Sequence, residues 1–336
     1  MKDAYIYDGT GWQSLKGPPG PSAVSADVDN AIKLGSDGLL YDNSIPARAD
    51  SYIVCKQGDS IAARYAAAKA LTPRGQALST TNRATLVVMP GTYTVSATLT
   101  IDAEFVDIWG VGNAAWHAAV LITGVAGNVI NVTADDVKVT GISTGAGRFG
   151  VLAGKPLQCI VNCTATGAGS FGQTGSSGLF AFCKAGGSAF GVGGETRGTY
   201  RNCIAGGASF GPSTPGGKAS GQFYDCFAEA NSFGEVGGAT GYFERCTGGG
   251  GCFGSPAIGG GSFVNCAVRA WLPSLTNLSQ GFRMNTNSTA TLVGCQIGAG
   301  SEYGDIGGVP GAGFRSATFV SCLLADGKIL NRERLE

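Results

Sequence analysis

Carboxylate side chains are the residues of this chain that could cleave a glycosidic bond. Such hydrolysis commonly uses two carboxylates about 5–9.5 Å apart, one as the acid and the other as the base or nucleophile. Glu195 and Glu235 lie 12 and 9 residues after a cysteine of the repeat described below, so they could share one edge of the fold. The alternative is that they are solvated surface charges, because Glu and Asp are mostly exposed. Other acidic candidates are Asp225, Glu229, Glu244, Glu302 and Asp305.

Three aromatic residues are candidates for ligand contacts. Trp271, Phe282 and Tyr303 fall in or beside two intervals where the repeat lengthens. Longer intervals indicate loops inserted on one face of a repeat protein, often the binding face. Aromatic rings there could stack on sugars, and filling a gap in the core or at a subunit interface is an equally good interpretation.

The sequence offers no other catalytic arrangement. The one histidine, His117, follows Ala114-Ala115-Trp116 and has no nucleophile beside it to activate. Cys159 and Cys163 have a spacing found in metal sites, but no second pair or histidine accompanies them. We therefore predict neither a metal site nor a cofactor.

A regular repeat must position all of these residues. From Cys163 to Cys266 a cysteine returns every 20 to 23 residues, and two more follow at intervals of 29 and 27. Repeats of this length predict a solenoid, in which each coil buries its inner face only by stacking on its neighbours. The repeat cysteines are Cys163, Cys183, Cys203, Cys226, Cys246, Cys266, Cys295 and Cys322. Apolar residues lie three positions earlier, at Ile160, Phe180, Tyr200, Phe223, Phe243, Phe263, Leu292 and Phe319, and Phe-Gly pairs begin at Phe171, Phe190, Phe210, Phe233 and Phe253.

The three-residue spacing requires a bend in each coil. Residues three apart on a straight strand point to opposite faces, so the aromatic residue and the cysteine can both face inward only if the chain turns between them. Asn or Asp precedes four of the cysteines, and these residues adopt the left-handed conformation more easily than others except glycine. The glycines of the Phe-Gly pairs supply a second corner. We therefore predict an all-β fold, a single-stranded parallel β-helix with cysteine and phenylalanine ladders, whose first corners are Asn162, Asn202, Asp225 and Asn265.

The chain has eleven cysteines, which could alternatively form disulfides. Equivalent atoms of stacked strands lie about 4.8 Å apart. This exceeds the roughly 3.5–4.5 Å between the Cβ atoms of a disulfide. The repeat therefore favours reduced, buried thiols that act as small core residues. Cys55, Cys159 and Cys252 fall outside the ladder and receive no assignment.

Composition excludes two classes of partner. Charged residues make up 14% of the 336 residues and the formal net charge is zero, so a nucleic-acid partner is not expected. The longest apolar stretches have the length of strands, which predicts no insertion into a membrane. The N-terminal residues 1–5 have no apolar region typical of a signal peptide.

Residues 59–71 contain the one convincing helix of the sequence. An open end of a solenoid exposes apolar core and unpaired strand edges, so a covering element is expected there. This helix is predicted to be the cap. Asp59 or Ser60 can begin it, and Ile61, Tyr65 and Ala68 share one of its faces.

The first 45 or so residues resemble the N-terminal segments of bacteriophage tail fibres and tailspikes. Residues 5–15, Tyr-Ile-Tyr-Asp-Gly-Thr-Gly-Trp-Gln-Ser-Leu, suggest a small hairpin. The Gly-Pro-Pro-Gly-Pro spacer at residues 17–21 is compatible with three chains side by side, or with a plain linker. Residues 30–39, Asn-Ala-Ile-Lys-Leu-Gly-Ser-Asp-Gly-Leu, complete the match within a stretch of weak helical character. The resemblance implies a homotrimer joined to the virion through other tail or baseplate proteins.

The next part of the chain resembles the opening of pectate-lyase-like right-handed β-helices. A helix is followed by Pro90-Gly91-Thr92-Tyr93, an alternating strand and Gly110-Val111-Gly112, and the resemblance extends from Cys55 to Cys322. Asp135-Asp136 resembles the paired aspartates of polygalacturonase-type β-helices, although a turn entering a strand also fits these residues. The histidine motif of that family is missing, as are the arginine-proline signature and calcium-binding aspartates of the lyases. The resemblance therefore implies the fold and not these activities.

Together these patterns predict five segments. They are a virion-attachment segment with its spacer (1–24), a linker (25–50), a helical cap (51–83), the β-helix (84–325) and a C-terminal tail of about one helical turn (326–336). The resemblance implies a phage tail fibre or tailspike subunit, made in the host cytoplasm and located in the virion, that recognises a host-surface carbohydrate. The alternatives are a polysaccharide depolymerase and a structural spacer without a ligand.

Overall fold

Most of the chain after residue 49 is described by the computed structural model. The described residues are 50–112, 119–151, 154–172, 175–191, 194–211, 218–229, 233, 238–249, 253, 260–268, 290–296, 318–323 and 329–332, with four short strands before them.

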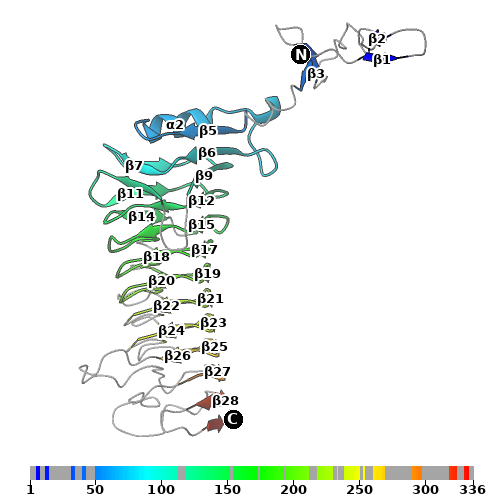
Figure 1. The fold of residues 1–336 in the computed structure, drawn as a ribbon. Coiled ribbons are helices and arrows are strands. Elements are labelled where there is room, and N and C mark those ends of the chain that lie inside the picture. Colours follow the sequence, from blue (N-terminus) through cyan, green and yellow to red (C-terminus); the bar gives the residue numbers. More distant parts are fainter. Residues whose placement is uncertain are drawn as a thin grey trace.

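The described coils stack on one another to form a parallel β-helix. Figure 1 shows the strands in register from β5 at one end to β28 at the other. One long sheet pairs each strand with its equivalent in the next coil, and its last strand pairs antiparallel with the strand before it. Its strands are β5 (Tyr52–Cys55), β6 (Ala84–Val88), β9 (Val106–Gly110), β12 (Lys138–Thr140), β15 (Cys159–Val161), β17 (Leu179–Ala181), β19 (Thr199–Arg201), β21 (Gln222–Tyr224), β23 (Tyr242–Glu244), β25 (Ser262–Val264), β27 (Thr291–Val293), β28 (Thr318–Leu323) and β29 (Ile329–Arg332).

Two further parallel sheets complete the coils. The second sheet contains β7 (Gly91–Thr94), β10 (Val120–Thr123), β13 (Ile142–Ser143), β16 (Thr164–Ala165), β18 (Lys184–Ala185), β20 (Ile204–Ala205), β22 (Phe227–Ala228), β24 (Thr247–Gly248) and β26 (Ala267–Val268). The third contains β8 (Leu99–Ile101), β11 (Asn128–Val132) and β14 (Arg148–Val151). All pairings in these two sheets are parallel, so the predicted all-β parallel β-helix is confirmed.

Two ladders of aromatic rings fill the core of the later coils. The predicted ladder of Phe180, Tyr200, Phe223, Phe243 and Phe263 stacks with ring centroids 4.7–5.1 Å apart. The phenylalanines of the Phe-Gly pairs form the second ladder, which begins at Phe149 and has spacings of 4.7–5.2 Å. The two ladders meet edge to face at 5.5–6.2 Å, an arrangement that aromatic quadrupoles favour.

The first predicted corner is confirmed in every coil where it was expected. Asn162, Asn202, Asp225 and Asn265 have φ between 49° and 53°, and the apolar residue two positions before each of them and the cysteine after it are buried. The predicted second corner is present at Gly172, Gly191 and Gly211, which have φ of 97–131°. The phenylalanine before each glycine also adopts the left-handed conformation, which was not predicted. Stacking of its ring in the core offsets the conformational cost. These residues are Phe171, Phe190, Phe210, Phe233 and Phe253, with φ of 52–57°.

The ten cysteines in the described part of the chain are free thiols, as predicted. Each ladder thiol donates to a carbonyl oxygen of the preceding coil, for example from Cys203 Sγ to Phe180 O at 3.5 Å. Burial raises the pKa of the Cys163 thiol to about 12. Cys55 ends β5 and is buried, whereas Cys159 begins β15 and is half-buried; Cys252 lies outside the described residues.

Helix α2 (Ile61–Lys69) packs against the first strands of the long sheet. Its apolar face is the predicted one, with Ile61, Tyr65 and Ala68 buried, and the side chain of Ser60 accepts from Ala63 N at its start. The Tyr65 hydroxyl accepts hydrogen bonds from Asp102 N and Ala103 N at 3.0 and 3.1 Å, which ties the helix to the coil behind it. A short 3₁₀ helix, η1 (Pro73–Gly75), follows. No helix in this part of the chain is long and apolar enough to cross a lipid bilayer.

The two ends of the chain form antiparallel pairs. β1 (Tyr5–Tyr7) pairs with β2 (Trp12–Ser14), which confirms the predicted hairpin. The stretch predicted to have weak helical character contains instead β3 (Ile32–Leu34) and β4 (Leu40–Asp42), a second antiparallel pair. The helical turn predicted for the C-terminal tail was also wrong, because β29 pairs with β28 and satisfies the edge of the last coil.

Candidate functional site

The outer face of the long sheet carries the candidate site. In each short strand the central residue points into the core, so the residues on either side of it point outward. Strand pairing then aligns the outward residues into two columns along the solenoid. Between β17 and β23 one column is Leu179, Thr199, Gln222 and Tyr242, and the other is Ala181, Arg201, Tyr224 and Glu244.

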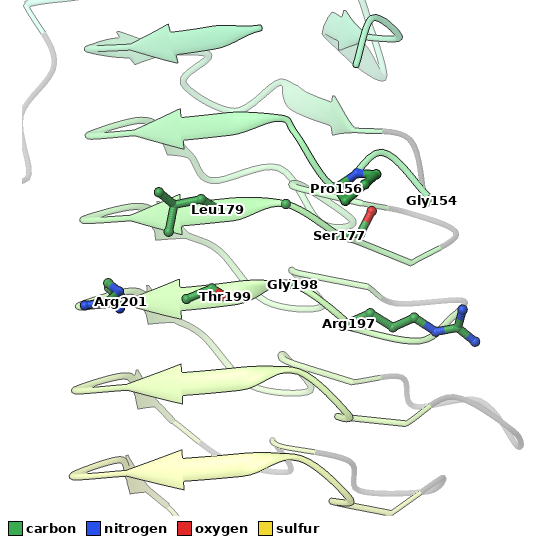
Figure 2. A pocket seen from close by; sticks show the side chains of 9 residues that line it. Gly154, Pro156, Ser177, Leu179, Arg197, Gly198, Thr199 and Arg201 are labelled. Carbon is green, nitrogen blue, oxygen red and sulfur yellow. The ribbon is translucent and has the colours of Figure 1, made fainter. Parts of the chain in front are cut away.

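An open groove of about 760 Å³ crosses β17 and β19 (Figure 2). Gly178 and Gly198 line it without side chains, so a ligand could approach the backbone there. Leu179 and Thr199 line the middle of the groove, and Figure 2 shows Arg197 and Arg201 toward its opposite ends. Pro156 and Ser177 complete the wall beside the glycines.

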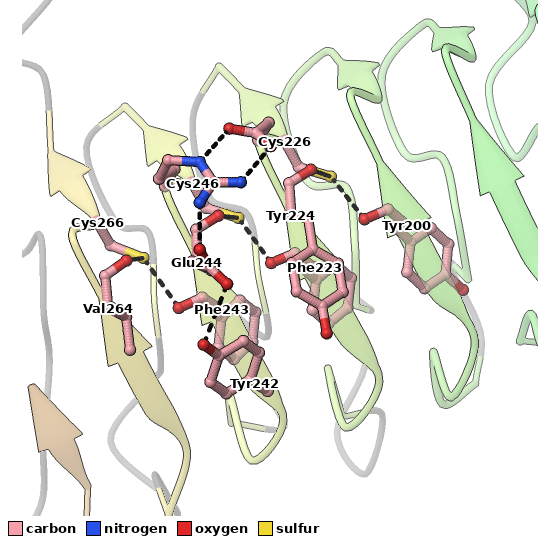
Figure 3. Close-up of polar contacts among 12 residues, drawn as sticks. Tyr200, Phe223, Tyr224, Cys226, Tyr242, Phe243, Glu244, Cys246, Val264 and Cys266 are labelled. Carbon is pink, nitrogen blue, oxygen red and sulfur yellow. Dashed lines mark hydrogen bonds and ion pairs between the residues drawn. The ribbon is translucent and has the colours of Figure 1, made fainter.

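Two tyrosines continue this surface toward the next coils (Figure 3). The rings of Tyr224 and Tyr242 are partly exposed, with centroids 5.8 Å apart. The guanidinium of Arg201 lies 4.8 Å from the Tyr224 ring centroid, which connects the tyrosine pair to the groove. The Tyr242 hydroxyl donates to Glu244 Oε2 at 3.1 Å.

A network of charges holds the edge of the tyrosine pair in place. Arg245 donates from Nε and Nη2 to the two carboxylate oxygens of Asp225 at 2.6 and 2.8 Å, and it also pairs with Glu244. The hydrogen bonds from Arg245 lower the pKa of the Asp225 carboxyl. Arg201, in contrast, has no carboxylate partner among the described residues.

The Asp225–Arg245 pair makes an acid-dependent contribution to stability. Because the pKa of Asp225 is lower in the folded state than in the unfolded chain, its contribution is present above about pH 4 and is lost as the pH falls through the folded pKa. Asp225→Asn keeps a residue suited to the left-handed corner. We expect a lower thermal midpoint than wild type at pH 7 and a smaller difference at about pH 3, because part of the contribution is lost once the unfolded chain is protonated. Equal differences at both pH values, measured by circular dichroism, would contradict the ion pair.

Glu195, the first sequence candidate for catalysis, is held in an ion pair. Arg197 donates to its Oε2 from Nε at 2.8 Å, and Ser220 Oγ donates to Oε1 at 2.5 Å. Both bonds lower the pKa of the Glu195 carboxyl, and the bond from Arg197 has the larger effect. A general acid needs a raised pKa, so this arrangement suits a structural or binding role better than acid catalysis.

Asp135 and Asp136 lie in the turn before β12 and brace it. Asp136 Oδ1 accepts from Arg83 Nη1 at 2.7 Å, and Arg83 also makes a bidentate pair with Asp107 at 2.7 and 2.8 Å. Asp135 Oδ1 accepts from Leu157 N at 3.0 Å. Both carboxylates therefore hold neighbouring coils together.

The structure does not test the predicted ligand-binding aromatic residues. Glu235, Trp271, Phe282 and Tyr303 lie outside the described residues, as do Glu302, Asp305 and His117. Glu229 is exposed just after β22. Among the residues that are described, no three His, Cys, Asp or Glu side chains are placed to hold a metal ion.

The sequence analysis missed Arg201, Tyr224 and Tyr242. Each directly precedes or follows a core aromatic residue of the repeat, at Tyr200, Phe223 or Phe243. The alternation that placed the core residues inward therefore also placed these three outward. The signal for these three residues is therefore present in the sequence.

The fold and this surface define a parallel β-helix protein with an exposed aromatic and charged face. No protein-family model and no curated protein sequence matches the chain. The pectin methylesterase of Aspergillus niger resembles it at 17% identity and a TM-score of 0.36, over 82% of this chain and 83% of that one. A proposed glycosyl hydrolase of Parabacteroides merdae resembles it at 12% identity and a TM-score of 0.17, over 76% and 86%. Likenesses at this level carry no argument about activity.

Proposed function

We propose that this chain is a subunit of a bacteriophage tail fibre or tailspike that binds a carbohydrate of the host surface. The observation that carries the proposal is the pair Tyr224 and Tyr242, partly exposed on a rigid sheet beside an open groove. Sugar rings have apolar faces and polar edges. A partly exposed tyrosine offers an apolar face together with a hydroxyl, and neighbouring charged side chains supply further hydrogen bonds.

Rigidity of the face supports binding. Strands β17 to β23 pair in uninterrupted register, and the core rings behind them are stacked. A ligand would therefore meet side chains that are already in position, which reduces the entropy lost on binding.

Binding is better supported than cleavage at the carboxylates on this face. Glu195 and Asp225 each pair with an arginine that lowers the pKa of the carboxyl. Glu244 accepts a hydrogen bond from Tyr242 and pairs with Arg245. A depolymerase would need one carboxyl to remain protonated near neutral pH.

The assembly is part of the same proposal. The N-terminal segment would attach a homotrimer to the virion, and α2 would act as the cap that covers the first coil, where it packs on β5 and β6. The sequence resemblance to pectate-lyase-like β-helices leads us to propose that the coils wind in the right-handed sense. Light scattering of the purified protein should give three times the chain mass of 33.8 kDa. A monomer would contradict the trimeric fibre and leave a single-chain adhesin.

Removal of an exposed ring tests carbohydrate binding. The measurement uses an array of bacterial surface polysaccharides. Tyr242→Ala should bind the glycans that wild type recognises at least tenfold more weakly, a loss of about 1.4 kcal/mol, because the stacking surface is lost. Tyr242→Phe should keep most of the affinity, since it keeps the ring. Tyr52→Ala is the control, because Tyr52 is an exposed tyrosine (43%) at the far end of the same sheet. Equal affinities of Tyr242→Ala and wild type would overturn the assignment of this face.

A further inference from the structure

One wall of the groove contains a buried hydroxyl group without a partner. Ser177 is 8% exposed, and its Oγ makes no hydrogen bond with any residue that the structure describes. Figure 2 shows the hydroxyl directed toward Pro156, across the groove wall. A buried hydroxyl that lacks a partner costs free energy, so a site that retains one is suited to a ligand that supplies the missing hydrogen bond.

The opposite end of the groove offers a free positive charge. Arg201 lines the groove, stacks on Tyr224 and has no carboxylate partner in the described part of the chain. Arg197, by comparison, is neutralised by Glu195. A guanidinium that is already oriented can bind a carboxylate with two parallel hydrogen bonds.

The two groups lie toward opposite ends of the groove, which favours a ligand longer than one sugar ring. Strand pairing aligns Leu179 with Thr199, so Ser177 lies in register with Arg197, four residues before Arg201. The chain bends at Gly178, which has φ of 102°, before the strand begins at Leu179. Between the two ends the groove is lined by Gly178, Gly198 and the side chains of Leu179 and Thr199, which leave room for a chain of rings.

From this geometry we infer that the groove binds an acidic oligosaccharide segment, with a sugar carboxylate at Arg201 and a sugar hydroxyl at Ser177. The inference rests on the proposed carbohydrate binding and specifies its ligand class. Neutral glycans would leave Arg201 without a counter-charge. They would gain only the contacts at the tyrosines and at Ser177.

Matched acidic and neutral probes test this assignment. The probes are tetrasaccharides of alginate and of hyaluronan, with their carboxyl-reduced forms as neutral counterparts, and binding to the full chain is measured by ligand-observed NMR. We expect at least tenfold tighter binding of one acidic probe than of its reduced form. Arg201→Gln should abolish this difference. Equal binding of the acidic and reduced forms, or no effect of Arg201→Gln, would overturn the inference.

Ser177→Ala separates a ligand-binding role from a structural one. Because the hydroxyl has no partner in the free protein, its removal should leave the thermal midpoint unchanged or raise it, while the affinity for the acidic probe falls about three- to tenfold. Thr140→Val is the matched control, since Thr140 Oγ1 is also buried without a partner in the described structure but lies outside the groove, on β12. It should leave affinity unchanged. A fall in the midpoint of Ser177→Ala with unchanged affinity would assign the hydroxyl to the fold instead.

The two proposals fail in different ways. If the chain binds only neutral glycans, and loses them on Tyr242→Ala, the acidic specificity is wrong and the proposed function stands. If neither the array nor any tetrasaccharide shows binding, both are wrong.

Discussion

Replacing Gly221 with alanine is expected to destabilise the β-helix by about 3 kcal/mol, or to prevent it from folding. A Cβ atom at this position would lie 2.2 Å from the carbonyl oxygen of Gly198 in the preceding coil. That oxygen accepts the hydrogen bond from Gln222 N at 2.9 Å, so it cannot move away without loss of a bond between coils. Urea unfolding followed by circular dichroism measures the change, and hydrogen exchange locates it.

The same close approach recurs along the solenoid. An added Cβ would lie 2.4 Å from the preceding coil at Gly198 and 2.1 Å from it at Gly241. Gly187 provides the control, because its added Cβ would meet only Gly207 O at 3.5 Å, an ordinary contact distance. Gly187→Ala should change stability by less than about 0.5 kcal/mol. A similarly small effect at Gly221 would mean that the coils can separate more easily than this stacking implies.

The second large effect is expected for Phe223→Ala, at about 4 kcal/mol of lost stability. The Phe223 ring is fully buried, stacks between Tyr200 and Phe243 at 4.8 and 4.7 Å, and meets Phe210 and Phe233 edge to face at 5.8 Å. Its removal leaves a cavity that backbone hydrogen bonds on both sides prevent from closing. The midpoint and slope of urea unfolding measure the loss.

An exposed phenylalanine of the same repeat is the control for this variant. Phe182 occupies the outer corner of its coil, is 45% exposed and has φ of 53°. Phe182→Ala should change stability by less than about 0.5 kcal/mol, because alanine pays a similar cost for the left-handed conformation and little buried area is lost. Equal losses at Phe182 and Phe223 would contradict a core built from stacked rings.

Local arguments predicted the coil and its two corners, but not that phenylalanine takes part in the second corner. A Phe-x-x-Cys spacing admits one solution with both side chains inward, a left-handed residue between them, and Asn202 and Asp225 adopt it. The second corner was predicted at the glycine of each Phe-Gly pair, and Gly211 does have a positive φ of 131°, but Phe210 before it is left-handed as well. The preference of a single residue could not reveal this, because the stabilising contact is with rings 20 or so residues away.

The candidate site was less accessible to prediction than the fold. Carboxylates were chosen by residue type, and the structure pairs Glu195 with Arg197 and Asp136 with Arg83. Which arginine remains without a partner depends on side chains from adjacent coils. Arg201 and Arg245 occupy neighbouring columns of the same face, yet only Arg245 lies beside Asp225 and Glu244.

The sequence by itself determined the architecture of this protein: the repeat length, the inward residues, the first corner and the helix with its buried face. These follow from alternation along a strand and from the conformational preferences of single residues, which are local properties. Only the tertiary structure decided which outward side chains meet, where a groove opens at Gly178 and Gly198, and that the hydroxyl of Ser177 is left without a partner. Those features depend on contacts between stacked coils, and residue order along one coil does not specify them.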